Sequence, residues 1–351
     1  MKRSKLLTLL LGFAILSGVV CSGIIIASGI KDNASASASS DGPRKEKSPQ
    51  PHTLEKTKLD EFSEATICLS YADLSILPSD GYYLEYRLDG TYTKPEYGVS
   101  DGKFYFEEGH AQKQFLISFG IGAHFTNPGP LYLNLYVPKD HYLKLLEVTM
   151  ESGDVDAEQA NAERAEFSIA YGDLDFGEFS GDDLIISSES GNINFEGITC
   201  KNLTVSDSYG NFTGDALSVS NRAEFSLESG NLDVSQLEAE TLSFNGQYGD
   251  CEAGSISVKK GEFSLESGNL ALENAALGNT SISSQYGDVR LMLSDQVSSY
   301  NYGLETEYGS ISVDGTSIKE NEDGQVLYQK QGSQKKKSID IFCESGNIKI
   351  W

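Results

Sequence analysis

The chain has 351 residues, enough for one large domain or two ordinary ones, and it carries 27 basic against 52 acidic side chains, for a net charge of −25. Such a charge repels nucleic acid and anionic lipid, so we expect no nucleic-acid partner. Between Glu151 and Ile318 there are 30 acidic and six basic residues, but regularly spaced Val, Leu, Ile and Phe indicate a folded acidic domain rather than a disordered tail.

The N-terminus has the pattern of a membrane anchor. Basic residues at positions 2, 3 and 5 precede an uncharged segment, 6–30, which is longer than the roughly 20 apolar residues that a membrane-spanning helix needs. We therefore predict a transmembrane helix over 6–30 within an anchor of residues 1–31, with a cytoplasmic N-terminus and an extracellular C-terminal domain at the cell membrane. A cleaved secretory signal and lipidation at Cys21 remain alternatives.

Composition divides the rest of the chain into three parts. Residues 32–58 are rich in Ser, Ala and Pro without apolar periodicity, which predicts a disordered linker. Residues 59–150 are rich in strand formers and predict a β-rich lead-in and cap. Residues 151–351 contain repeats, interrupted by a Lys-rich insertion at 319–337. This insertion is interpreted as a solvated loop, or as a contact for the acidic flank or for an anionic wall polymer.

A Ser-Gly or Tyr-Gly pair recurs with successive glycine spacings of 19, 19, 19, 20, 19, 19, 19, 22 and 37 residues. The glycines are Gly153, Gly172, Gly191, Gly210, Gly230, Gly249, Gly268, Gly287, Gly309 and Gly346. The residues five before and two after each glycine are apolar, and spacing by two around a glycine indicates a strand, a sharp structural corner and a second strand. One such unit is too short to bury its own apolar face, so stacked units must share a core.

The sequence therefore predicts an all-β fold, a single-stranded parallel β-helix (β-solenoid) of about 19 residues per coil. Right-handed coiling is expected because right-handed crossovers dominate between parallel strands.

Serine and tyrosine alternate before the glycine from Gly153 to Gly287, which indicates a longer repeat of two coils. The tyrosines, Tyr171, Tyr209, Tyr248 and Tyr286, are candidate ligand contacts because aromatic rings stack on sugars. The alternative is a row that only seals the surface of the rod.

The Asp or Asn that follows nine of the ten glycines, all except Gly309, has two interpretations. One is a ladder of amide and carboxylate groups that supports the corner. The other is Ca²⁺ binding, with Glu151 and Asp154 as weak candidate ligands, although the spacing of Ca²⁺-binding β-rolls is missing. The five cysteines lack metal-ligand spacing. No cofactor is expected.

An enzyme is not indicated. Many β-helices act on polysaccharides, but they need clustered carboxylates with a basic residue or bound Ca²⁺, and breaks in the coils that form a cleft. Here the coils are uniform, and His52, His110, His124 and His141 all precede the first corner. We therefore assign no catalytic residues.

The lead-in Ala72–Ile76, the strand Tyr132–Pro138 and the repeated Ser-Gly-Asp/Asn corners together resemble the bacterial putative-adhesin family of β-strand-repeat envelope proteins, typical of Gram-positive bacteria. The resemblance covers about residues 59–351. It implies a parallel β-helix on the cell envelope, with an adhesin-like role and no established catalytic residues.

The hypothesis from these observations is a non-catalytic cell-surface adhesin-like or interaction protein, with a cell-wall glycan or a protein as ligand and the membrane as partner through residues 6–30. The alternative is an envelope-stress or structural accessory protein that partners other membrane proteins. A polysaccharide-active β-helix enzyme is the less favoured third possibility.

Overall fold

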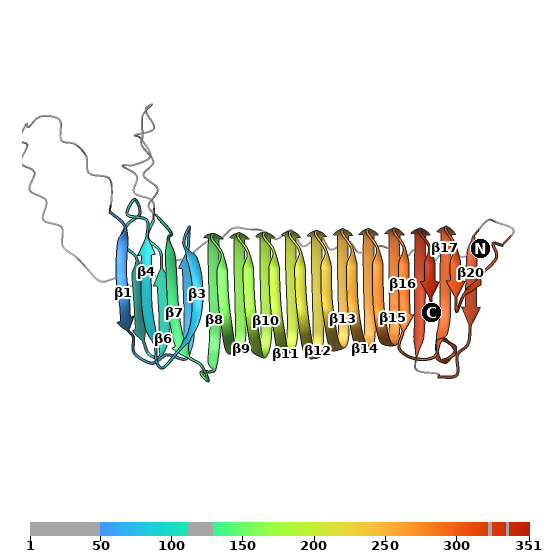
Figure 1. Cartoon of the computed structure of the whole chain (residues 1–351), viewed down its shortest axis with the longest axis horizontal. Helices are drawn as coiled ribbons and strands as arrows, with labels where there is room; N and C mark the ends of the chain where they lie inside the picture. Colours follow the sequence, from blue (N-terminus) through green and yellow to red (C-terminus); the bar gives the residue numbers. More distant parts are fainter. Residues whose placement is uncertain (1–49, 111–128, 322–324, 335–336) are drawn as a thin grey trace, which may run out of the picture. The chain divides into compact units, whose positions relative to one another are not determined.

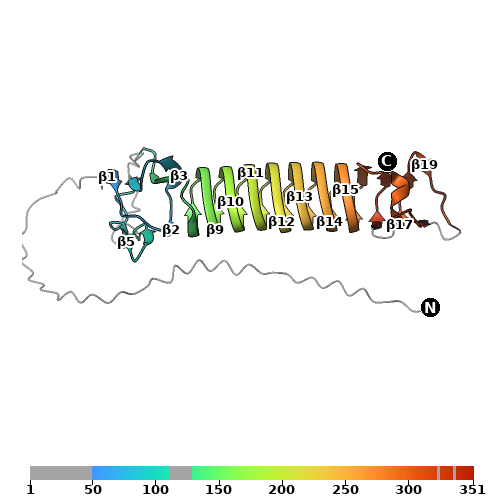
Figure 2. The same ribbon diagram turned by 90° about the horizontal axis from the view of Figure 1, so that it is seen from below.

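The computed structural model describes residues 50–110, 129–321, 325–334 and 337–351, and all of them belong to one compact unit, Ser48–Trp351. Within this unit the strands wind into coils stacked in a row (Figure 1), and Figure 2 shows the same coils from below. Apart from one short 3-10 helix, η1 (Val297–Ser299), the described elements are all strands. The predicted all-β solenoid is therefore present.

The predicted membrane helix is corrected. Nowhere in the described ranges is there a helix with the length and apolar character needed to cross a bilayer, and residues 6–30 lie outside those ranges. An uncharged segment shows hydrophobicity only, whereas a span also requires backbone groups paired within a helix. The single-pass membrane location that rested on this helix is wrong for the same reason.

The regular part of the solenoid consists of long strands joined by two-residue turns. They are β8 (Leu143–Ser152), β9 (Val155–Tyr171), β10 (Leu174–Ser190), β11 (Ile193–Tyr209), β12 (Phe212–Ser229), β13 (Leu232–Tyr248), β14 (Cys251–Ser267) and β15 (Leu270–Tyr286). Each pairs in parallel with the next, so that residue 174 lies beside 155 and 193. A residue and its counterpart one coil later are therefore neighbours in space.

Each coil has three corners, of which the sequence indicated one. In β9 the alternation of inward and outward side chains is broken by outward pairs at Glu158–Gln159 and Glu163–Arg164, and the coil then turns at Gly172–Asp173. These are called the second, third and glycine corners. In β12 the register shifts between Val219 and Arg222 at the third corner. This additional residue accounts for the single spacing of 20.

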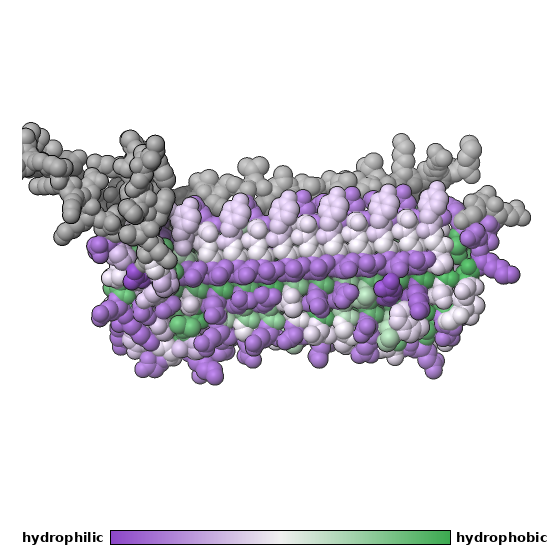
Figure 3. All heavy atoms as spheres, turned by 45° about the horizontal axis from the view of Figure 1, so that its top comes forward, coloured by the Kyte–Doolittle hydropathy of each residue, from purple (hydrophilic) through white to green (hydrophobic). Residues whose placement is uncertain are grey.

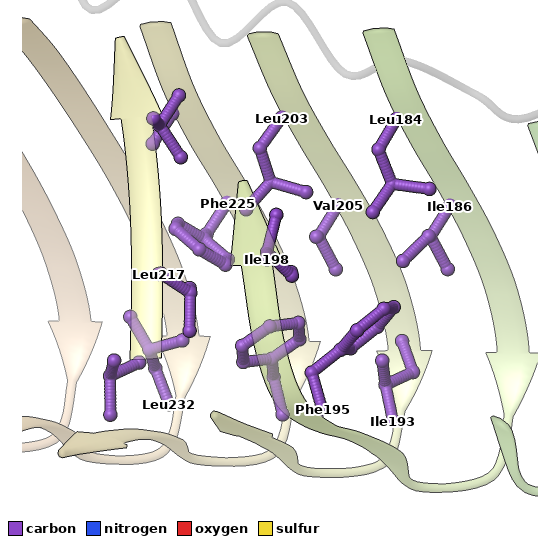
Figure 4. Packing of buried hydrophobic residues seen from close by; sticks show 14 of the residues in the cluster. Leu184, Ile186, Ile193, Phe195, Ile198, Leu203, Val205, Leu217, Phe225 and Leu232 are labelled. Atoms are coloured by element: carbon purple, nitrogen blue, oxygen red, sulfur yellow. The ribbon is translucent and has the colours of Figure 1, made fainter. Parts of the chain in front are cut away.

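The inward side chains form one continuous apolar core. Phe195 stacks on Phe176 of the preceding coil with ring centroids 5.0 Å apart, and on Phe212 of the following coil at 6.1 Å. Figure 4 shows Phe195 between Ile193 and Val205, with residues of neighbouring coils repeating the arrangement. Because identical columns stack at the inter-strand spacing of about 4.8 Å, each coil completes the core of its neighbours.

The N-terminal end is closed by shorter strands. They are β1 (His52–Lys58), β2 (Glu64–Leu69), β3 (Asp73–Ser79), β4 (Tyr83–Leu88), β5 (Glu96–Ser100), β6 (Lys103–Glu107) and β7 (Tyr132–Pro138). β2 pairs in parallel with β8 and β3 with β9, which adds one irregular coil. Antiparallel pairs β1–β4 and β5–β6 then cover this end. β1 falls within the segment for which the sequence predicted a linker.

The C-terminal end departs from sequential stacking. Its elements are β16 (Val289–Leu293), β17 (Asn301–Tyr308), β18 (Ile311–Val313), β19 (Thr316–Ser317), β20 (Val326–Lys330), β21 (Ser338–Ser345) and β22 (Ile348–Ile350). β21 lies between β15 and β17, and β22 between β16 and β18. The last strands of the chain thus lie between two coils that both precede them in the sequence. β20, inside the predicted Lys-rich insertion, pairs antiparallel with β17.

Candidate functional site: an exposed tyrosine row

Exposed tyrosines follow the solenoid beside the glycine corners, and they include the four sequence-predicted contacts. Fractional exposures run from 53% to 73% in this tyrosine row, which consists of Tyr71, Tyr171, Tyr209, Tyr248, Tyr286 and Tyr308. At the same position on the intervening coils stand Ser152, Ser190, Ser229, Ser267 and Ser345. Figure 3 shows the row as pale ridges along one side, above a continuous hydrophilic stripe.

The alternation of tyrosine and serine holds at both irregular ends of the row. At the C-terminal end, Ser345 pairs with Tyr286 on one side and with Tyr308 on the other, although it follows both in sequence. At the N-terminal end, Tyr71 comes opposite Ser152, because the pairs on either side of it have the same offset of 81 residues. The pattern is therefore a property of the folded surface.

Sequence reasoning missed Tyr71 and Tyr308. Tyr71 is followed by Ala72 and Asp73, which keeps the tyrosine and the aspartate of the repeat but lacks its glycine. Tyr308 precedes the predicted corner Gly309, but the alternation read along the chain ends at Tyr286. A search for tyrosine two residues before Asp or Asn would have found Tyr71.

A row of glutamates, the acidic row, borders the tyrosine row. Each member directly precedes one of the serines that lie in the gaps between successive tyrosines of the row. The members are Glu151, Glu189, Glu228, Glu266 and Glu344. No ion pair within the described part of the chain involves any of these five carboxylates. Every gap between two tyrosines thus contains a hydroxyl group and an adjoining carboxylate.

On the other side of the corner glycines, side-chain oxygens form a hydrogen-bonded ladder. In each step one side-chain oxygen accepts a hydrogen bond from the backbone N–H one coil further on, at 2.6–3.3 Å. In spatial order the ladder consists of Asp73, Asp154, Asp173, Asn192, Asn211, Asn231, Asp250, Asn269, Asp288, Asn347 and Ser310. The ladder holds the backbone that carries the tyrosines in a fixed register.

The ladder engages one carboxylate oxygen of a candidate Ca²⁺ ligand. Asp154 Oδ1 accepts the backbone N–H of Asp173 at 2.9 Å. In the described ranges no three His, Cys, Asp or Glu side chains come together as a metal site would require. Glu151, the other candidate, is a member of the acidic row.

At the predicted corner glycines the backbones of neighbouring coils come very close to each other. A Cβ atom on residue 172 would lie 1.9 Å from the Gly153 carbonyl oxygen, and φ at this position is +143°. A side chain would collide with backbone that cannot move without breaking the stack. The tyrosine is therefore separated from the ladder residue by one position, and only glycine fits at that position.

Positive charge gathers at another corner of the coil. Five of the six basic residues between 151 and 318 stand at the third corner or beside it: Arg164, Lys201, Arg222, Lys259 and Lys260. They pair with acids there, as Lys201 Nζ does with Asp182 Oδ2 at 2.6 Å. The remaining one, Arg290, pairs with Asp288 at 3.1 Å. Among the described residues, none of these cations pairs with the acidic row.

The described histidines lie in the N-terminal cap and have separate partners. His52 Nε2 is 3.0 Å from the Tyr92 carbonyl oxygen, and His141 Nδ1 is 3.0 Å from the Tyr82 hydroxyl. Burial lowers the pKa of His141. His110 is exposed and lies 3.4 Å from Glu107, whereas His124 is outside the described residues. No histidine stands beside the tyrosine row in the described coils.

Two carboxyl groups are buried within the described residues: Glu108 in the N-terminal cap and Asp207 in the regular coils. Asp207 is 3% exposed and stands in register with Ser188 of the preceding coil, in a column that also contains Ile169 and Leu227. Loss of hydration raises the pKa of Asp207 to about 6, and the Ser188 hydroxyl and two backbone N–H groups offset only part of this shift.

Solved structures resemble the fold at low sequence identity. A putative lipid binding protein from Parabacteroides distasonis is 16% identical, with 86% of this chain and 97% of that chain covered and a TM-score of 0.41. A putative adhesin from Bacteroides fragilis is 12% identical, with 86% and 99% covered and a TM-score of 0.32. A putative cell adhesion protein from Clostridium sporogenes is 12% identical, with 86% and 99% covered and a TM-score of 0.23. Similarity at this level carries no argument about function.

No curated protein matches the chain. The family model described as Toastrack DUF4097 matches residues 63–202 and 178–351, which together span the irregular first coil, the regular solenoid and the inserted C-terminal strands. The chain therefore belongs to the Toastrack DUF4097 family.

Proposed function

We propose that this protein is a non-catalytic, adhesin-like interaction protein that binds its ligand along the tyrosine row. The observation that carries this proposal is that every ring of the row is more than half exposed, although most large apolar side chains of the same coils are buried. Large aromatic side chains gain free energy from burial, so a regular row of exposed rings is a surface that a partner can cover.

The ladder explains why such a surface would bind well. Ligand binding costs conformational entropy when the protein must order itself, and a backbone held in register by the ladder has little left to lose. Several weak ring contacts on one rigid body also act together, because the first contact raises the effective concentration for the next. A long polymer therefore suits the row better than a compact ligand.

A glycan array and a cell-wall polysaccharide panel test this proposal with the full chain. The double variant Tyr209→Ala/Tyr248→Ala removes two neighbouring rings from the middle of the row and should lower binding at least tenfold. Tyr142→Ala is the matched control, because Tyr142 is 50% exposed but precedes β8 near the third corner. Equal binding by both variants and the unmodified protein would refute the proposal.

A further inference from the structure

We propose that the ligand of the tyrosine row is an extended, positively charged amino-sugar polymer of the β-1,4-linked type, lying along the solenoid axis. Sugar rings stack on the tyrosines, and ammonium groups meet the acidic row in the gaps. This inference rests on the proposed function and adds the chemical class of the ligand.

The two-coil period is a property of the folded surface. A duplicated two-coil repeat would explain the alternation along the regular coils, but the order of repeats along the chain does not give the alternation at the C-terminal end. Ser345 belongs to the inserted strand β21, yet it separates Tyr286 from Tyr308. Glu344 precedes Ser345 as Glu266 precedes Ser267. Chain segments that are distant in sequence thus come together to continue the same tyrosine–gap pattern, which indicates that the spacing itself is required.

The length of the two-coil period matches the repeat of an extended β-1,4-linked glycan. Two inter-strand spacings place successive rings of the row about 9.6 Å apart. In an extended β-1,4-linked glycan each sugar is turned over relative to the last, so the same face recurs every second sugar, at a distance of the same order. One ring per disaccharide can then stack on each tyrosine. An extended peptide strand fits worse, since its same-face side chains recur at about 6.8 Å.

The glutamates between the tyrosines favour a positively charged ligand. The gap between Tyr209 and Tyr248 contains Ser229 and Glu228, and the gap between Tyr248 and the next ring contains Ser267 and an equivalent glutamate. Within the described part of the chain these glutamates have no cationic partner, because the basic residues pair elsewhere. A repeating negative charge beside a ring favours a cation at the same interval.

The polar groups beside the tyrosine row favour the sugar polymer over a proline-rich peptide. A polyproline II helix repeats at about 9.3 Å and also packs on aromatic rows. Its prolines, however, have no N–H to donate to the carboxylates and hydroxyls of the gaps. An outward row of hydroxyl groups adjoins the acidic row, including Ser168, Ser187 and Ser206. A polyol with ammonium groups can satisfy all of these groups.

The experiment measures binding of the full chain to a β-1,4-glucosamine hexamer, its fully N-acetylated counterpart and a Lys-containing proline-rich peptide. The glucosamine hexamer should bind at least tenfold more tightly than the other two, and less so at high salt. The double variant Glu228→Gln/Glu266→Gln should lose that preference and keep its binding to the acetylated hexamer. Glu238→Gln, an exposed glutamate on another wall of the coil, is the control.

Ser229→Tyr, which fills one gap, should weaken glucosamine binding without loss of stability. Equal affinity for the amine and acetylated hexamers, or tighter binding of the peptide, would overturn this inference. An unchanged affinity in Glu228→Gln/Glu266→Gln would also overturn it, while a loss in Tyr209→Ala/Tyr248→Ala would leave the proposed function standing. If the tyrosine variant also binds unchanged, both proposals fail.

Discussion

The carbonyl oxygen of Gly230 lies 2.0 Å from the point that a Cβ atom on Gly249 would occupy. The same close approach recurs from coil to coil: a Cβ atom on Gly268 would lie 1.9 Å from the Gly249 carbonyl oxygen. The neighbouring oxygen belongs to backbone that is fixed by the strand ladder. The corner glycine is therefore a requirement of stacking as well as of turning.

Gly249→Ala should lower the free energy of unfolding by roughly 3 kcal/mol or more, because the new methyl group meets backbone and φ is +147°. Gly315→Ala is the control: φ is +71°, but nothing lies within 4 Å of the added atom. Its cost should be about 1–2 kcal/mol, from the backbone conformation alone. Urea unfolding followed by circular dichroism measures both, and equal costs would contradict the close-approach explanation.

The ladder gives a second prediction. Asn231 Oδ1 accepts the backbone N–H of Asp250 at 2.8 Å, and Asn231→Ala removes this acceptor. The loss should be about 1 kcal/mol, since water reaches the exposed corner and replaces part of the bond. Asn231→Asp keeps an acceptor of the same shape and should cost clearly less. A cost for Asn231→Asp as large as for Asn231→Ala would argue against the ladder.

The glycine corner and the inward columns could be predicted because they depend on residue type. Only glycine tolerates the close approach, and a period of two around it specifies the buried face. The second corner has no such requirement: Glu158–Gln159 and Gly254–Ser255 both occupy it. Two successive outward side chains are enough to make that bend, so composition does not mark it.

Spatial order at the ends was also beyond prediction. The 37-residue spacing between Gly309 and Gly346 shows an insertion but not that β21 enters between β15 and β17. Both neighbours offer parallel strands with the same apolar columns, so local pattern cannot choose between them. For the candidate site, this meant that four tyrosines of the row were found but its continuation to Tyr308 was not.

Asp207 predicts an unusual pH dependence. Its pKa is raised to about 6 in the folded protein, against about 3.9 in the unfolded chain, so the folded state binds more protons between these values. Stability should therefore fall by roughly 2 to 3 kcal/mol as pH rises from about 4 to above 6. Because a side-chain amide carries no charge at any of these pH values, Asp207→Asn should be more stable than the unmodified protein at pH 8 and about equal at pH 4.

Melting temperatures of the unmodified protein and Asp207→Asn at pH 4, 6 and 8 provide the measurement. Ser188→Ala is a useful companion, because it removes the hydroxyl beside Asp207. Without that hydroxyl, which lowers the pKa of Asp207, the pKa should rise further, which extends the loss of stability to higher pH. A difference between Asp207→Asn and the unmodified protein that does not change with pH would contradict the assignment.

The inserted strands give the last prediction, on the order of assembly. Deleting 338–351 removes β21 and β22, whose buried side chains Ile339, Ile341 and Ile348 are at most 2% exposed. β15 and β17 then lose a shared parallel partner. Since each coil of a solenoid is stabilised by its neighbours, residues 294–334 should become open to proteolysis while the coils up to β14 stay protected. Removal of Trp351 alone should leave the digestion pattern unchanged. Continued protection of 294–334 in the truncated protein would mean that β17 can pair directly with β15.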